Sequence, residues 1–221
     1  GLQATGKLHF GNYFGAMKQN IDLANSGEYE SFVFIADYHS LTTVKNAEAL
    51  RQNALEIAVS YIACGLDTSK ATLFKQSDVP EHTELSVIFG NVVTVPYLMR
   101  AHAFKDHEAK NKEVSLGLFT YPVLMAADIL IYQADVVPVG KDQKQHIEFA
   151  RDIAGFYNRT WNVEQFKLPD EVIIEGVGTV PGIDGGKMTK SKGNGISLFG
   201  SDEETKKAVM SIVTDSASPE D

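Results

Sequence analysis

The sequence predicts an α/β fold, in which a doubly wound parallel sheet carries helices on both faces. Its 221 residues are 43 % hydrophobic and 22 % charged, which is ordinary for a globular protein and excludes a disordered chain. Short, continuously apolar segments, typical of strands buried on both faces, alternate with segments of helical periodicity. This alternation predicts parallel strands joined by helices, with binding sites in the loops that follow the strands.

The first third of the chain gives three such segments. Apolar residues at three- to four-residue spacing predict a helix over residues 14–24, which Gly27 can end. The apolar run 32–36 predicts a buried strand. A second helix is expected over residues 50–64, because its apolar residues again recur at helical spacing and Gly65 follows them.

The middle of the chain continues the alternation. Residues 71–74 predict a strand, and Pro80 lies where it can begin the next helix. Basic and polar residues crowd into segment 100–112, which predicts a mobile surface stretch. A further helix is expected to begin near Tyr121 and Pro122.

The last third contains one more strand and two helices. A strand is expected over residues 135–139 and a helix over residues 147–157. Residues 176–195 are rich in glycine and lysine and predict a loop. The spacing of Ser201 and Glu204 is that of a capping box, which predicts the start of the last helix.

Charge and cysteine content exclude several kinds of protein. The net charge of −9 argues against binding nucleic acid through bulk positive charge. The single cysteine, Cys64, excludes an internal disulfide framework and a multi-cysteine zinc site, and it fits a cytoplasmic location. No apolar run reaches the roughly 18–20 residues of a membrane span, so no membrane partner is expected.

The first candidate binding segment is His9-Phe10-Gly11-Asn12, at the start of a predicted helix. A helix N-terminus offers free N–H groups and a partial positive charge to a phosphate. Gly11 lets a nucleotide approach the backbone, and His9 and Asn12 could donate hydrogen bonds to it. An ordinary helix start is the alternative interpretation.

The second candidate is the glycine-bracketed loop that contains Lys187, Lys190 and Lys192. Its positive charge, hydroxyl groups and backbone freedom suit a clamp on a polyphosphate. A solvated basic loop explains the same residues equally well.

Two acidic residues also have open roles. Asp128 lies within an apolar segment, where a carboxylate is costly without a partner, so it meets either a structural donor or a polar atom of a ligand. Asp142, with Gly140 and Gln143 just after a predicted strand, suits either ribose hydroxyls or a helix N-cap.

Together these segments resemble one family. The segment His9–Asn12 is similar to the first signature of class I aminoacyl-tRNA synthetases. The segment Lys187-Met188-Thr189-Lys190-Ser191 is similar to their lysine loop, with Thr189 in place of a serine. Residues 119–130 and 137–146 narrow the resemblance to the tryptophanyl-tRNA synthetases. The resemblance covers nearly the whole chain and implies the Rossmann-like catalytic core of that class.

The resemblance implies a role for each matched residue. The catalytic residues would be His9, Asn12, Lys187 and Lys190. The ATP site would comprise Gln3, Gly11, Asn12, Gly140, Asp142, Gln143, Lys187, Met188, Lys190 and Ser191. The tryptophan site would comprise Asp128, Met125, His39, Tyr121 and Gln143, with Asp128 accepting the indole N–H. No protein ligand to a metal is expected. His107 stands where many relatives place a lysine.

The resemblance also implies an activity, which is the ATP-dependent activation of L-tryptophan and its transfer to tRNA(Trp). ATP and Mg²⁺ would be required, and the protein would be a cytoplasmic homodimer. Residues 1–200 would form the catalytic domain, and residues 201–221 would begin a helical tRNA-binding domain that continues beyond them. Two alternatives stay open: a tyrosyl-tRNA synthetase, and a synthetase-derived nucleotide-binding module without ligase activity.

Overall fold

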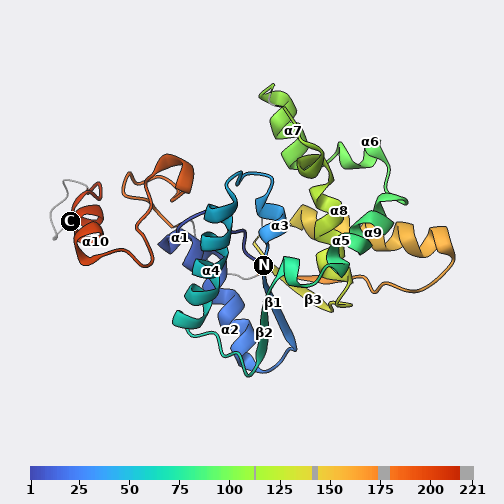
Figure 1. The fold of residues 1–221 in the computed structure, drawn as a ribbon, viewed down its shortest axis with the longest axis horizontal. Coiled ribbons are helices and arrows are strands. Elements are labelled where there is room, and N and C mark those ends of the chain that lie inside the picture. The colour runs from blue at the N-terminus through green and yellow to red at the C-terminus, as the bar shows by residue number, and fades with distance from the viewer. Residues whose placement is uncertain (112, 141–143, 174–179, 215–221) are drawn as a thin grey trace, which may run out of the picture.

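The computed structural model describes residues 1–111, 113–140, 144–173 and 180–214 (Figure 1). The strands are β1 (Ser31–Ile35), β2 (Ala71–Lys75), β3 (Val136–Val139) and β4 (Asp170–Ile173). The α-helices are α1 (Phe10–Asn12), α2 (Lys18–Ser26), α3 (Asp37–Ser40), α4 (Ala47–Ala63), α5 (Glu81–Gly90), α6 (Val95–Leu98), α7 (His102–Ala109), α8 (Leu116–Leu130), α9 (Lys144–Trp161) and α10 (Asp202–Met210). A π-helix, η1 (Tyr13–Met17), and two 3₁₀ turns, η2 (Gln76–Asp78) and η4 (Lys190–Lys192), complete these elements.

The strands form two parallel pairs, which confirms the predicted α/β class. β1 pairs with β2 from Ser31 opposite Ala71 onward, and β3 pairs with β4 from Val136 opposite Asp170 onward. Leu2 adds a single parallel bridge to Ile35 on β1. The sequence gives no strand prediction for β4, because this short strand begins with two acidic residues, which are depleted in strands.

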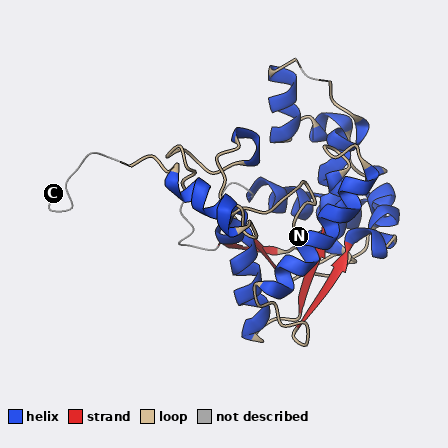
Figure 2. Cartoon of the chain, turned by 60° about the vertical axis from the view of Figure 1, so that its left-hand side comes forward, coloured by secondary structure: helices blue, strands red, loops and turns tan. Residues whose placement is uncertain are grey.

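Side chains of β1 alternate between two packed faces. Val33 and Ile35 belong to an apolar core with residues of α2 and α4. On the opposite face, Phe32 stacks on Tyr132 with ring centroids 4.7 Å apart, and Phe34 lies against the ring of His82. The strands are therefore covered on both sides, as predicted, and Figure 2 shows helices on either side of them.

A second apolar core joins α5, α8 and α9. Phe89 is fully buried in it, and Ala126, Ala127 and Ala150 are fully buried where α8 and α9 pack together. Small side chains at these positions let the two helix backbones approach closely. This core fixes α8, which carries Asp128 and ends beside the face of β1 that carries Phe32.

Most predicted helix ends are confirmed. Gly27 ends α2 in the left-handed conformation, with φ of +76°. The hydroxyl of Ser201 accepts the N–H of Glu204, and the Glu204 carboxylate accepts the N–H of Ser201, which is the predicted capping box of α10. None of the described helices is long and apolar enough to cross a membrane.

The sequence prediction misses one helix and misplaces the start of another. Within segment 100–112, which is expected as a mobile surface stretch, His102–Ala109 forms α7, and Phe104 packs edge-on against Phe119. Helix α8 begins at Leu116 and not near Tyr121, because Ser115 caps it by accepting the N–H of Leu118 at 3.2 Å. Pro122 therefore lies inside the helix, where the surrounding packing offsets its cost.

We expect Phe89→Ala to lower the free energy of unfolding by about 3–5 kcal/mol, because it leaves a cavity in the second core. Val87→Ala is the matched control on the same helix, since Val87 is 70 % exposed. It should change the free energy by about 0.5 kcal/mol or less. Urea unfolding of both variants measures the difference, and equal losses would contradict the assignment of this core.

Candidate functional site

The two candidate binding segments lie side by side, although more than 170 residues separate them. The backbone N–H of Phe10 donates to the carbonyl of Ile196 at 3.0 Å, and the N–H of Leu198 donates to the carbonyl of Leu8 at 2.9 Å. The N–H of Gly11 also points at the sulfur of Met188, at 3.2 Å. The start of α1 and the lysine loop therefore form one surface.

Gly11 is required by close packing at this junction. A Cβ at this position would lie 2.9 Å from Nδ1 of His9 and 3.3 Å from Cβ of Met188. The side-chain oxygen of Asn12 accepts the N–H of His9 at 3.1 Å, which fixes the start of the helix. The chain then continues as the π-helix η1. π-Helices are rare in proteins, and those that occur are often found at functional sites.

His9 is buried at the same place, with 8 % of its surface exposed. Its Nδ1 atom has no hydrogen-bond partner among the described residues. Burial lowers the pKa of His9, and the positive charge of Lys190 lowers it further, so the ring is neutral at pH 7. An unpaired buried nitrogen is costly, so this atom is suited to bond a ligand.

Lys190 lies across the first segment of the chain. Its ammonium donates to the carbonyl of Gly6 at 2.9 Å and to the hydroxyl of Thr5 at 3.3 Å. Partial burial removes water from the Lys190 ammonium group, which disfavours its charged form and lowers the pKa of Lys190. Met188 is buried, whereas Lys187 is exposed. The structure thus brings His9, Gly11, Met188 and Lys190 together and leaves the side chain of Lys187 at the surface.

Asn194 organises the lysine loop, although no role was predicted for it. Its side-chain oxygen accepts the N–H of Thr189 at 2.8 Å, and its amide donates to Asp184 at 2.7 Å and to the carbonyl of Lys187 at 3.0 Å. The hydrogen bond from Asn194 is the main cause that lowers the pKa of Asp184. Its position between two glycines, 193 and 195, was the available sign of a tight turn.

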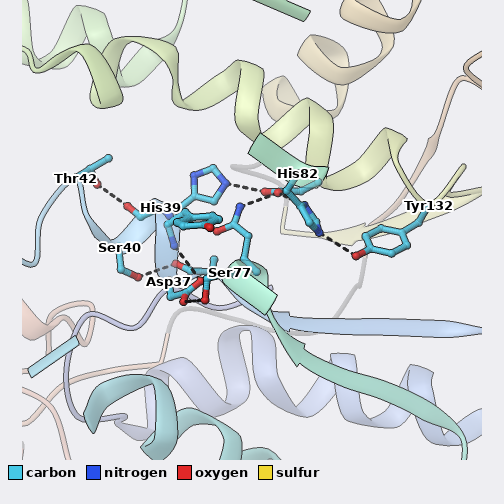
Figure 3. Close-up of polar contacts among 11 residues, drawn as sticks. Asp37, His39, Ser40, Thr42, Ser77, His82 and Tyr132 are labelled. Atoms are coloured by element: carbon cyan, nitrogen blue, oxygen red, sulfur yellow. Dashed lines mark hydrogen bonds and ion pairs between the residues drawn. The ribbon is translucent and has the colours of Figure 1, made fainter. Parts of the chain in front are cut away.

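Asp128 lies in a second polar cluster, with 5 % of its surface exposed. One carboxylate oxygen, Oδ1, accepts from Nε2 of Gln76 and Nδ1 of His82, and the other, Oδ2, accepts from Nε2 of His39; each distance is 2.7 Å (Figure 3). Burial alone raises the pKa of a carboxyl group. The hydrogen bonds from His39, His82 and Gln76 outweigh burial and hold the pKa of Asp128 below its usual value.

Gln76 and His82 were not among the sequence candidates. Gln76 directly follows β2, and His82 lies in the first turn of α5. Both therefore lie in the segment that follows the carboxyl end of β2, where the α/β fold predicts ligand sites. The position after a strand was the sequence feature that could have pointed to Gln76 and His82. A single polar residue after a strand is too common to predict a site without further evidence.

The remaining candidates for the tryptophan site are spread over three places. His39 and Tyr121 line a cleft of about 450 Å³. Asp128 lines a second cleft, of about 350 Å³, between β1 and β3. Met125 packs against the second apolar core. His39 therefore connects the two clefts, because it lines one of them and donates a hydrogen bond to the Asp128 carboxylate that lines the other.

The other nucleotide-site candidates lie at strand ends or outside the description. Gln3 is exposed just after the Leu2 bridge, and Gly140 is exposed just after β3. Asp142 and Gln143 lie outside the described residues, as does the side chain of Ser191. His107 lies on α7 and buries an Nδ1 atom that has no partner in the described structure.

Comparison with known proteins identifies the family. The family model described as tRNA synthetases class I (W and Y) matches residues 1–220. The chain belongs to this synthetase family. Its similarity to a tryptophan–tRNA ligase of Fusobacterium nucleatum is 56 % identity over 98 % of the chain and 66 % of that protein. A tryptophan–tRNA ligase of Rhodopirellula baltica is 50 % identical over 100 % of the chain and 68 % of that protein.

Solved synthetase structures agree with the sequence comparison. Tryptophanyl-tRNA synthetase from Campylobacter jejuni, complexed with ADP and tryptophan, superposes with a TM-score of 0.90 and 47 % identity over 98 % of this chain and 67 % of that one. A tyrosyl-tRNA synthetase from Archaeoglobus fulgidus reaches a TM-score of 0.69 at 24 % identity, which shows the shared fold. The chain spans about two thirds of the length of its two bacterial relatives named above, 66 % and 68 %.

We expect Asn194→Ala to loosen the lysine loop, because it removes three hydrogen bonds from a residue that is 3 % exposed. Unpaired buried groups cost about 1–3 kcal/mol, which raises the population of the open loop on the order of tenfold or more. Trypsin cleavage after Lys187, Lys190 or Lys192 should accelerate accordingly. Asn91→Ala, which removes one local bond at an exposed site, should leave it unchanged. Equal cleavage in both variants would contradict this role.

Proposed function

We propose that the chain is the catalytic part of a tryptophan–tRNA ligase. It would activate L-tryptophan with ATP to tryptophanyl adenylate and pass the amino acid to the terminal ribose of tRNA(Trp). The observation that carries the proposal is the junction of the His9–Asn12 helix start with Met188 and Lys190. Relatives of 48–56 % identity named as tryptophan–tRNA ligases favour tryptophan over tyrosine as the substrate.

In the first step the tryptophan carboxylate would attack the α-phosphorus of ATP, and pyrophosphate would leave. Lys190 and Lys187 would offset the charge that grows on the phosphates, with His9 and Asn12 as hydrogen-bond donors. Positioning and charge stabilisation supply the catalysis, so the step requires no general base. Because His9 is neutral, its ring can donate to a phosphate oxygen without adding a second charge beside Lys190.

The same surface supports binding of the nucleotide. Gly11 keeps the start of α1 free of a side chain that would meet His9 and Met188, and the unpaired Nδ1 of His9 would gain a partner from a phosphate oxygen. We assign adenine and phosphate contacts to Gln3, Met188 and Ser191, and the ribose to Gly140, Asp142 and Gln143, on the family resemblance. Mg²⁺, when bound, would neutralise phosphate charge. The phosphates of ATP would carry the ion.

Asp128 would select the amino acid. Its lowered pKa keeps the carboxylate ionised, so it can only accept hydrogen bonds and would accept the indole N–H of tryptophan. A site built for such a donor can reject analogues that lack it by about 10⁴–10⁵-fold. On the family resemblance we also assign His39, Met125, Tyr121 and Gln143 to the tryptophan site, although in this structure His39 and Tyr121 line a different cleft from Asp128.

The remaining proposals concern assembly and location. We propose a cytoplasmic homodimer that binds tRNA, with residues 1–200 as the catalytic domain and residues 201–221 as the start of a helical tRNA-binding region. Helix α10 supports this division, because it buries none of its own side chains and lies at the edge of the molecule, away from α8 and α9 (Figure 1).

Exchange of labelled pyrophosphate into ATP tests the proposed function. Purified protein should catalyse exchange with tryptophan and not with tyrosine or phenylalanine, because only the adenylate of the cognate amino acid forms and reverses. Exchange with tyrosine alone would show a tyrosyl-tRNA synthetase. Exchange with no amino acid in the panel would favour a nucleotide-binding module without ligase activity.

We expect Lys190→Ala to lower the rate of exchange by about 10²–10³-fold, because it removes a charge that stabilises the transition state. Tryptophan binding, measured by equilibrium titration, should change little. Lys206→Ala removes the same charge from exposed helix α10 and should leave both quantities unchanged. An unaltered exchange rate in Lys190→Ala would exclude Lys190 from the reaction.

A further inference from the structure

The two oxygens of the Asp128 carboxylate are bonded unequally. Oδ1 accepts two hydrogen bonds, from Gln76 and His82, whereas Oδ2 accepts one, from His39. A carboxylate has about four acceptor positions, two on each oxygen. Among the described residues, Oδ1 is therefore fully used, and Oδ2 retains one position. The protein itself thus determines which oxygen can accept a further N–H.

The two donors to Oδ1 are buried completely. Gln76 and His82 both have 0 % exposure, so neither can exchange its bond to the carboxylate for one to water. Gln76 is held further, because its side-chain oxygen lies 3.4 Å from the backbone N–H of His39. One amide thus connects the carboxylate with the residue that bonds its other oxygen.

His82 is fixed from behind by Tyr132. The Nε2 atom of His82 lies 2.9 Å from the hydroxyl of Tyr132, on the side of the ring away from the carboxylate (Figure 3). In a neutral ring whose Nδ1–H donates to Asp128, Nε2 must accept, so the hydroxyl donates to it. The ring of Tyr132 stacks on Phe32, and the ring of His82 packs against the neighbouring rings of Phe34 and Phe74. The ring orientation of His82 is therefore determined, and a neutral ring in this place carries its proton on Nδ1.

We propose that Gln76 and His82, supported by Tyr132, are positioning residues that bind Oδ1 of Asp128 and thereby present Oδ2 to the N–H of the amino-acid side chain. The proposal rests on the proposed function, in which Asp128 accepts the indole N–H. Neither Gln76 nor His82 touches the substrate in this scheme. They act by preventing the carboxylate from rotating and by leaving one acceptor position in one direction.

The test compares tryptophan with benzothienylalanine, in which sulfur replaces the indole N–H. The measured quantity is the ratio of kcat/KM for the two amino acids in pyrophosphate exchange. Gln76→Met removes one donor to Oδ1, and we expect the ratio to fall on the order of tenfold. Tyr132→Phe removes only the hydroxyl behind His82, and the ratio should fall about threefold, with activity toward the analogue retained.

His82→Asn is the conservative variant, because an asparagine amide can donate from nearly the place of Nδ1 but has no counterpart of Nε2. The ratio of kcat/KM for tryptophan to that for benzothienylalanine should fall less in His82→Asn than in His82→Leu. Adding Tyr132→Phe to His82→Asn should cause no further fall, because the hydroxyl acts through Nε2. Tyr61→Phe is the matched control: it removes a hydroxyl from a fully buried tyrosine whose partner is Asn20, and the ratio should stay constant.

A structural role alone would lower kcat/KM for both amino acids equally and leave their ratio unchanged. That result in active Gln76→Met and Tyr132→Phe proteins would overturn the positioning proposal while the proposed function stands. If the unaltered protein shows no tryptophan-dependent exchange, the proposed function fails, and the positioning proposal fails with it.

Discussion

The buried carboxylate of Asp128 is the constraint on which the arrangement of the helices around the sheet depends. A charge with 5 % exposure is tolerated only when hydrogen bonds replace its water. Its three donors come from α3, from the turn after β2 and from α5, while the carboxylate itself comes from α8. Satisfying one charge therefore fixes the relative positions of both strand ends and of the second helical core.

The surface proposed to bind the nucleotide is organised by backbone hydrogen bonds and not by charge. Bonds from Phe10 to Ile196 and from Leu198 to Leu8 join the start of α1 to the lysine loop. Because Gly11 has no side chain, both His9 and Met188 can pack closely against its backbone. Lysine side chains extend from this backbone frame, which explains why a chain with a net charge of −9 can still present a local cationic surface.

The fold was largely predictable, because its strands are continuously apolar and its helices keep their periodicity or carry caps. Prediction failed where distant contacts decide the structure: Phe104 packs on Phe119 to support α7 within a polar segment, and acidic β4 forms only by pairing with β3. In the site, the motifs around His9 and Lys190 were visible in the sequence. Gln76, His82 and Asn194 were not, because their roles depend on partners 52, 46 and 10 residues away.

The contact of Lys190 with Gly6 spans 184 residues, which bears on how the protein is made. A ribosome adding about 5–20 residues per second needs roughly ten to forty seconds between the two positions. Throughout that time the first segment can pair with β1 through Leu2, but it lacks the loop that covers it. The two apolar cores can condense while the chain is still growing, whereas the surface proposed to bind the nucleotide cannot form until the lysine loop has been made.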